Sequence, residues 1–346
     1  MRMVLIGAVD STRVALEALA RHGAPPAALF TLAPGRGARR HSDYVELRPL
    51  AERLGVPVVE APDVNAPEAL ARLRLLAPDY ALVIGWSQLC RAEFLRTPRL
   101  GAVGFHPAPL PENRGRAVIP WTILQGRADT GATLFWMDEG ADSGDVLLQE
   151  RFAVAPDETA ATLYAKHLAA LGRMLDRAIP QLLLGTAPRV PQDHARATYC
   201  AKRVRADGLI DWRAPAREVW RLVRAVGDPY PGAFTHLRGR ALTVWAADYV
   251  GPAPYHGLPG QVQALGDGGA LVQCGDGEHV LLRTVQPEGD DERADAQTLL
   301  RIHERLGVDL GELMVLYERL RERQAEGERE GKGDARRDAP SVVGAS

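Results

Sequence analysis

The sequence predicts an α/β protein, in which a mostly parallel sheet forms a first domain and a smaller β-barrel-like domain follows. In the first half of the chain, short apolar runs alternate with amphipathic stretches of about ten residues, which is typical of βαβ units. In the second half, apolar segments are separated by glycine- and proline-rich turns, as in small β-barrels. The length of 346 residues also favours two domains.

The elements of the first domain follow from this alternation. In parallel sheets the ligand crevice lies beyond the carboxyl ends of the strands, so the residues after Gly85 and His106 are expected there. Strands are expected at residues 3–7, 27–32, 57–60, 80–85 and 101–106, and helices at 11–20, 44–54, 65–75, 88–95 and 158–185, the last with an interruption at Pro180.

Changes in composition set the expected domain boundaries. Residues 1–185 are expected to form the first domain, and residues 186–205, rich in Pro, Gln and Arg and without periodicity, a linker. Residues 311–346 are expected to be a charged helix and a disordered tail, because charged and small residues dominate there. Residues 206–310 form the second domain, with a helix at 216–226 and strands at 232–250, 260–265, 270–273 and 279–285.

Composition and charge exclude several classes of protein. The net charge of −2 gives no overall attraction to nucleic acid or to an anionic membrane. Three widely separated cysteines (Cys90, Cys200 and Cys274) argue against a disulfide framework or a zinc site and indicate a reducing cytoplasm. No signal peptide is recognisable, and no apolar run is long enough to span a bilayer.

Known cofactor loops are not found in the sequence. Ala8-Val9-Asp10 follows the first strand where a dinucleotide-binding protein would carry its glycine fingerprint, and there is no Gly-Lys-Ser/Thr phosphate loop. A nicotinamide cofactor is therefore unsupported.

The segment from Gly104 to Asp145 places His106 at a strand end and Asp142 on an acidic, glycine-flanked loop. A histidine exchanges protons near neutral pH, and a carboxylate can set its protonation. A single histidine or aspartate at such a position is more often structural. The two residues together favour a proton-transfer site.

The sequence of this segment resembles the signature of the methionyl-tRNA formyltransferases and of the related amino-sugar and hydroxamate formyltransferases. The resemblance is carried by HPAPLPENRGRAVIPW after the strand, by GATLFWMDEGADSGD, and by DGLIDW and PYPGAF in the second domain. It covers most of the chain. It implies the formyltransferase fold, a Rossmann-like catalytic domain followed by a smaller barrel-like domain.

The resemblance also implies the chemistry. The formyl donor would be 10-formyltetrahydrofolate, with no metal, and an amine would attack the formyl carbon and lose a proton to His106. Asp142 would stabilise the resulting imidazolium. By position, the folate-contacting residues would be Gly85, Trp86, Ser87, Ala108, Pro109, Leu110, Pro111, Arg116, Asp138, Glu139, Gly140, Ala141 and Asp142.

Gly104 departs from the family pattern, which has an asparagine two residues before the histidine as a hydrogen-bond donor to the developing oxyanion. Loss of such a donor costs on the order of a hundredfold in rate. Three explanations are open: a substitute donor, for which Asn113, Ser87 and Gln88 are candidates; a water in the space of the missing side chain; or loss of catalysis. Because both proton-handling residues are present, a substitute donor is favoured.

Three arginines are candidates for substrate contacts. Arg114 adjoins the flexible Gly115, and Arg39 and Arg40 follow the second strand, where they could grip a phosphate or an acidic group. A solvated loop explains Arg39 and Arg40 equally well.

The expected acceptor is the amine of a small metabolite, either a nucleotide-linked amino sugar or an N-hydroxyornithine-type siderophore precursor. Residues 201–310 hold about 13 Lys/Arg against about 15 Asp/Glu, whereas tRNA binding needs a basic face. Methionyl-tRNA is the alternative acceptor. A catalytically impaired folate-binding protein and a formate-releasing hydrolase are the alternatives of other classes. Oligomeric state is not readable from the sequence.

Overall fold

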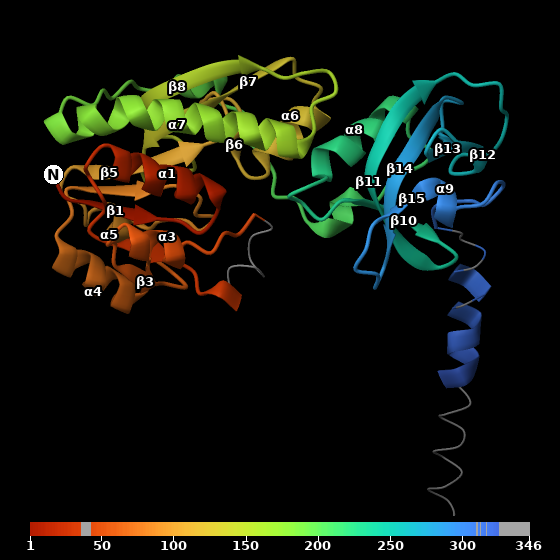
Figure 1. The fold of residues 1–346 in the computed structure, drawn as a ribbon, viewed down its shortest axis with the longest axis horizontal. Coiled ribbons are helices and arrows are strands. Elements are labelled where there is room, and N and C mark those ends of the chain that lie inside the picture. Colours follow the sequence, from red (N-terminus) through yellow and green to blue (C-terminus); the bar gives the residue numbers. More distant parts are fainter. Residues whose placement is uncertain (36–42, 309–310, 312, 316, 325–346) are drawn as a thin grey trace, which may run out of the picture.

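The computed structural model describes residues 1–35, 43–308, 311, 313–315 and 317–324. Arg39, Arg40 and the expected disordered tail beyond residue 324 therefore lie outside the described residues. Residues 311, 313–315 and 317–324 are helical. The rest of the chain folds into an α/β domain and a smaller β-rich domain (Figure 1).

A seven-stranded sheet forms the centre of the first domain, in the order β3-β2-β1-β4-β5-β7-β8. The first five strands in this order are parallel, and the last two are antiparallel, which confirms the mostly parallel sheet. The strands are β1 (Met3–Ile6), β2 (Leu29–Thr31), β3 (Val58–Glu60), β4 (Tyr80–Val83), β5 (Gly101–His106), β7 (Asp129–Trp136) and β8 (Val146–Ala153).

Helices cover both faces of this sheet. α1 (Asp10–Arg21), α3 (Arg48–Arg53) and α7 (Ala160–Leu184) contribute to the core on one face. α4 (Pro67–Leu76) and α5 (Ala92–Leu95) contribute to the core on the other. Because the central strands are buried on both sides, they are continuous apolar runs rather than alternating ones.

The strand order reverses between β1 and β4, and two glycines lie at this point. A Cβ added at Gly7 would come within 2.0 Å of the carbonyl oxygen of Ile84, and Gly85 has φ +76°. Glycine fits both positions because it has no Cβ. In doubly wound sheets a ligand crevice opens at such a reversal, so Gly85 stands where the sequence predicted a binding loop.

Several predicted elements differ from those observed. The predicted helix at 88–95 is reduced to α5, because the side chain of Asn65 hydrogen-bonds the backbone of Leu89 and Arg91 and replaces the first helical turn. The predicted helix at 44–54 begins only at Arg48, since Pro49 favours the start of a helix. α7 continues past Pro180 to Leu184. The antiparallel pair β7 and β8 was not predicted.

The second domain is an antiparallel sheet, and α8 (Ala216–Val226) and the short α9 (Ala296–Leu299) pack on its core. The predicted strand at 232–250 is a hairpin, because Arg238 and Gly239 both have positive φ and form a turn. The strands, in the order β10-β11-β14-β13-β12 with β15 beside β14, are β10 (Ala233–Leu237), β11 (Arg240–Gly251), β12 (Val262–Gly266), β13 (Gly269–Gln273), β14 (His279–Pro287) and β15 (Ala294–Asp295).

The segment between the domains lies against the first domain. Val190 bridges to Val146 at the start of β8, and β9 (Tyr199–Cys200) pairs in parallel with β6 (Arg114–Gly115). α6 (Val118–Leu124) packs near α8, as Figure 1 shows. No helix among the described residues is long and apolar enough to cross a membrane.

Candidate functional site

His106 is the last residue of β5, and its buried ring is held in one orientation. Its Nε2 lies 2.7 Å from the backbone oxygen of Asn113. A carbonyl oxygen only accepts hydrogen bonds, so Nε2 carries a hydrogen and donates it. In the neutral ring, Nδ1 therefore holds the lone pair, and Nδ1 lies 3.5 Å from Oδ2 of Asp142. Nδ1 is the atom at which this ring can take up a proton, beside a carboxylate.

Asp142 lies on the loop between β7 and β8, and several contacts define its place. Its backbone has φ +52°, a conformation that aspartate tolerates better than most residues. Its Oδ2 accepts a hydrogen bond of 2.8 Å from the backbone nitrogen of Gly115. At the start of the loop, Oδ1 of Asp138 accepts from Gly140 N and Ser143 Oγ, so Asp138 caps the loop. Glu139, Gly140 and Ala141 are exposed.

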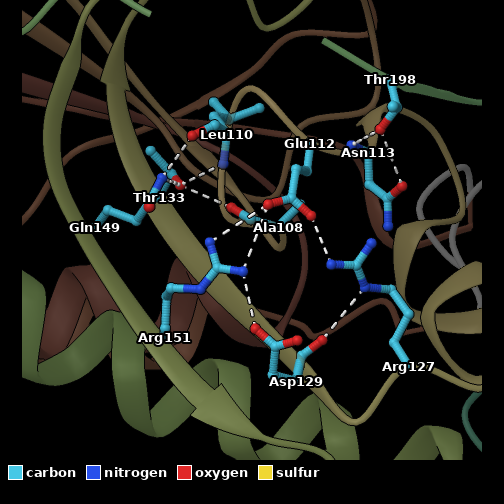
Figure 2. Close-up of polar contacts among 10 residues, drawn as sticks. All are labelled: Ala108, Leu110, Glu112, Asn113, Arg127, Asp129, Thr133, Gln149, Arg151 and Thr198. Carbon is cyan, nitrogen blue, oxygen red and sulfur yellow. Dashed lines mark hydrogen bonds and ion pairs between the residues drawn. The ribbon is translucent and has the colours of Figure 1, made fainter. Parts of the chain in front are cut away.

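The proline-rich loop after His106 is tied to the sheet through Thr133 (Figure 2). The Thr133 hydroxyl donates to the Ala108 oxygen at 2.7 Å and accepts from the Leu110 nitrogen at 3.2 Å. Gln149 Nε2 donates to the Leu110 oxygen at 2.8 Å and to Thr133 Oγ1 at 3.0 Å. In the strand register Thr133 faces His106 on one side and Gln149 on the other. The three form one polar row across β5, β7 and β8, which holds the loop between Pro107 and Pro111.

A ring of charges lies beside this row (Figure 2). Glu112 pairs with Arg127 and Arg151, and Arg151 also bonds Asp129. The hydrogen bond from Arg151 holds the pKa of Asp129 below its usual range. These side chains are partly exposed, so we assign the ring to the support of the loop rather than to chemistry.

The segment Gly85-Trp86-Ser87 faces the same region from the end of β4. The Arg116 guanidinium donates to the Ser87 oxygen, which joins two of the predicted folate-contacting segments. The Trp86 indole N–H is buried and has no hydrogen-bond partner among the described residues. A buried donor of this kind is suited to a polar ligand atom. These observations fit a bound pterin, with Trp86 and the backbone of Gly85 and Ser87 along one edge.

The space at Gly104 is filled by other side chains. Gly104 pairs with Phe135 across β5 and β7. A Cβ added at Gly104 would lie 2.8 Å from Cε1 and 2.9 Å from Cζ of Phe135, and 3.1 Å from Cγ of Met137. The Phe135 ring therefore takes the place where a side chain at position 104 would begin, which disfavours the explanation that a water occupies this space.

The three candidate oxyanion donors lie in different surroundings. Asn113 is nearest to the histidine, since its own backbone bonds the His106 ring; its amide Nδ2 lies 3.3 Å from Gln125 Oε1. Gln88 Nε2 donates to the Pro62 oxygen at 2.8 Å. Ser87 adjoins the Arg116 contact.

Arg114 is buried, with 2% of its surface exposed. Its Nη2 donates to Gln192 Oε1 at 2.7 Å and approaches His194 Nδ1 at 3.1 Å, and its Nη1 donates to the Tyr199 hydroxyl at 3.2 Å. These contacts, with the segment that joins the domains, give Arg114 a structural role. This burial does not support the prediction that Arg114 contacts the substrate.

Sequence reasoning missed three residues of the site: Thr133, Gln149 and Gln192. Thr133 and Gln149 are identified only by the register of β7 and β8, which were not predicted. Gln192 contacts the Asp142 loop from about fifty residues further along the chain. The motif GATLFW gave a local indication of Thr133, because this threonine is polar among apolar residues.

The fold and this site together define a class of protein: an α/β enzyme with a histidine–carboxylate pair at the end of a parallel sheet, followed by an antiparallel β domain. This is the folate-dependent N-formyltransferase class. Residues 23–179 match the formyl transferase family, and residues 203–303 match the formyl transferase C-terminal domain. The chain belongs to the formyltransferase family.

Relatives cover both domains. The chain is 34% identical over 301 residues to a methionyl-tRNA formyltransferase of Geobacter metallireducens, covering 86% of this chain and 94% of the relative. It is 36% identical over 306 residues to the methionyl-tRNA formyltransferase of Symbiobacterium thermophilum, covering 87% and 92%.

Solved structures share the fold at low identity. HypX from Aquifex aeolicus in complex with tetrahydrofolic acid has a TM-score of 0.61 at 19% identity, over 87% of this chain and 47% of that chain. An N-formyltransferase from Helicobacter canadensis in complex with folinic acid and dTDP-3-aminofucose has a TM-score of 0.60 at 15% identity, over 82% and 99%.

Proposed function

We propose that this protein transfers a formyl group from 10-formyltetrahydrofolate to a primary amine, with His106 as the proton acceptor. The observation that carries the proposal is the orientation of His106. Its Nε2 is bonded to the Asn113 backbone and its Nδ1 lies beside Asp142. A ring held in this way has one free lone pair, next to a negative charge that stabilises its protonated form.

The residues of the site divide the work of the reaction. The donor brings the formyl group, and the loop held by Thr133 and the segment after Gly85 orient it. The attacking amine loses its proton to Nδ1 of His106, and Asp142 stabilises the imidazolium that forms. The same ring can then return the proton to the leaving nitrogen of the donor.

Transition-state charge on the formyl oxygen needs a donor other than residue 104. We propose Asn113 for this role, because it is the candidate nearest the His106 ring and its contact with the exposed Gln125 is long. Asn113→Ala should then lower kcat on the order of a hundredfold, while Ser87→Ala and Gln88→Ala change it little. A large loss of kcat in Ser87→Ala or Gln88→Ala, with little change in Asn113→Ala, would assign the role to the loop after β4.

For the acceptor we propose the amino group of methionyl-tRNA, in place of the small amine that the sequence favoured. The relatives with 34–36% identity over both domains are methionyl-tRNA formyltransferases. A local concentration of charge adds support: residues 186–226 hold 9 Lys/Arg against 4 Asp/Glu. The balance over 201–310 had hidden this basic segment, because acidic residues outnumber basic ones in the residues that follow it.

The basic segment combines charge with aromatic rings. Arg203 lies over Trp121, Arg217 over Tyr249, and Arg224 over Trp220. The Trp121 indole also donates to the Ala201 oxygen, so the middle of the segment contacts α6. Cations that contact phosphates, interleaved with aromatic surfaces, are the features that bind a single-stranded RNA end.

A small acceptor is the second candidate, and the near balance of charge over residues 201–310 favours it. The deciding assay uses the purified protein, 10-formyltetrahydrofolate, and three acceptors: initiator methionyl-tRNA, a nucleotide-linked amino sugar and N-hydroxyornithine. We expect a formylated product with methionyl-tRNA, and a KM for tRNA that rises with salt. Product only with a small amine would overturn the proposed acceptor. Tight folate binding without transfer to any amine would overturn the enzyme itself, and formate release without acceptor would indicate a hydrolase.

The exposed Lys202 and Arg205 provide a sharper test of the acceptor. Lys202→Glu and Arg205→Glu should each raise the KM for methionyl-tRNA at least about tenfold and leave folate binding unchanged. Asp211→Lys, a charge change of similar size on the same segment, is the matched control and should not weaken tRNA binding. An unchanged KM in both glutamate variants would remove this segment from the acceptor site.

A further inference from the structure

Gln192 joins the segment between the domains to the loop that carries Asp142. It is 7% exposed, although glutamine is usually found at the surface. Its Nε2 donates to the backbone oxygen of Asp142 at 2.9 Å and to that of Gly144 at 2.6 Å. Its Oε1 accepts from Nη2 of Arg114 at 2.7 Å. The side-chain oxygen and both N–H groups are therefore used.

The contact with Arg114 determines which way the amide of Gln192 points. A guanidinium has only donors, so the oxygen of the amide must face it. The amide nitrogen then faces the loop, where both of its partners are carbonyl oxygens. No rotation of the amide satisfies all three partners in another way, so the orientation is unique.

Gln192 holds the backbone at and after Asp142, while the Asp138 cap holds the start of the loop. Residues 139–141 are exposed, and Asp142 itself has φ +52°. Among the described residues, the Asp142 carboxylate accepts one hydrogen bond, from Gly115 N, which lies on a strand that is itself paired with β9. The segment between the domains thus contacts both the loop that carries the carboxylate and the strand that receives it.

We propose that Gln192 is a positioning residue of the formyl-transfer site: it holds the Asp142 carboxylate beside Nδ1 of His106, so that the segment joining the domains completes the site. The proposal rests on the proposed function for its kinetic readout. It does not require a particular acceptor, because Gln192 contacts only the loop and Arg114.

Gln192→Glu separates positioning from packing. Glutamate keeps the size and an acceptor for Arg114, but its two oxygens repel the carbonyls of Asp142 and Gly144, so the loop should move away. Gln192→Ala removes all three bonds. Arg177→Gln is the control, because Arg177 is exposed on α7, outside the basic segment and away from the Asp142 loop. All variants are measured with saturating donor and acceptor, and their thermal unfolding is recorded.

We expect kcat to fall about 10- to 100-fold in Gln192→Glu and Gln192→Ala, and to stay within twofold in Arg177→Gln. The acidic limb of the pH–rate profile should move to lower pH, as it does when the carboxylate is removed by Asp142→Asn. In the double variant Gln192→Glu/Asp142→Asn, the loss should be no larger than in Asp142→Asn alone. Additive losses, an unmoved limb, or a kcat within twofold of wild type would each overturn the proposal.

A second measurement does not depend on turnover. The protonation of His106 can be followed by NMR in wild type and Gln192→Glu, and the pH at which the ring takes up a proton should fall in the variant. An equal pH in both proteins would overturn the positioning role. A wild-type protein that transfers formyl to no acceptor, yet shows this NMR difference, would refute the proposed function and leave the role of Gln192 in place.

Discussion

Restoring an asparagine at position 104 should harm this protein, although the family pattern has one there. An added Cβ would already lie 2.8 Å from the Phe135 ring, closer than real Cβ atoms come. Overpacking of this kind costs about 1–3 kcal/mol, and an amide buried without a partner costs about 1–3 kcal/mol more. We expect Gly104→Asn to lower the free energy of unfolding by about 2–6 kcal/mol.

The assay is urea and thermal unfolding followed by circular dichroism, with kcat measured beside it. For a domain of this size, 2 kcal/mol corresponds to a Tm lower by about 4–8 °C. Gly172→Ala is the control, since a Cβ at Gly172 would have only one neighbour, Val14 at 3.8 Å. That change, inside α7, should be neutral or stabilising by up to about 1 kcal/mol.

A second variant tests the cause. Phe135→Ala alone should cost about 3–5 kcal/mol through the cavity it leaves. In Gly104→Asn/Phe135→Ala the asparagine occupies that cavity, so the combined loss should be smaller than the sum of the two by at least about 1 kcal/mol. If Gly104→Asn is as stable and active as wild type, or if the two losses simply add, Phe135 does not fill the place of the missing side chain.

The remaining predictions concern proton transfer, the loop and the core. His106→Ala should abolish transfer while donor binding, measured by fluorescence titration, stays within a few-fold; activity above about a tenth of wild type would refute its role. Asp142→Asn should move the acidic limb of the pH–rate profile to lower pH, because the imidazolium loses its stabilising charge; an unmoved limb would mean that the carboxylate only supports the loop. Thr133→Val removes two bonds to the proline loop and should weaken donor binding about tenfold, with unchanged affinity as the contrary result. Burial lowers the pKa of His167 to about 3. Below pH 6.5 this histidine therefore becomes protonated in the unfolded chain but stays neutral in the folded protein. Wild type should therefore lose about 1.4 kcal/mol more per pH unit than His167→Leu between pH 6 and 4, and equal slopes in urea titrations would contradict this.

Local patterns were sufficient for much of the fold. Residues 80–83 and 101–106 are apolar runs with no competing polar pattern, and both are buried parallel strands, as predicted. The prediction of a helix at residues 88–95 was largely wrong, because Asn65, more than twenty residues away, supplies the hydrogen bonds that a helical turn would have made. The prediction of a single strand at residues 232–250 was wrong, because a two-residue turn at Arg238-Gly239 lies inside an otherwise continuous β pattern.

The sequence by itself determined the parallel sheet, the β domain, and the chemical types present at the site, because strand patterning and a histidine at a strand end are local properties. Only the tertiary structure decided which nitrogen of His106 is free, because a backbone oxygen seven residues away binds the other one. It also decided that Phe135 fills the space at Gly104 and that Gln192 anchors the Asp142 loop. These follow from strand register and from contacts across about fifty residues of chain, which no local pattern records.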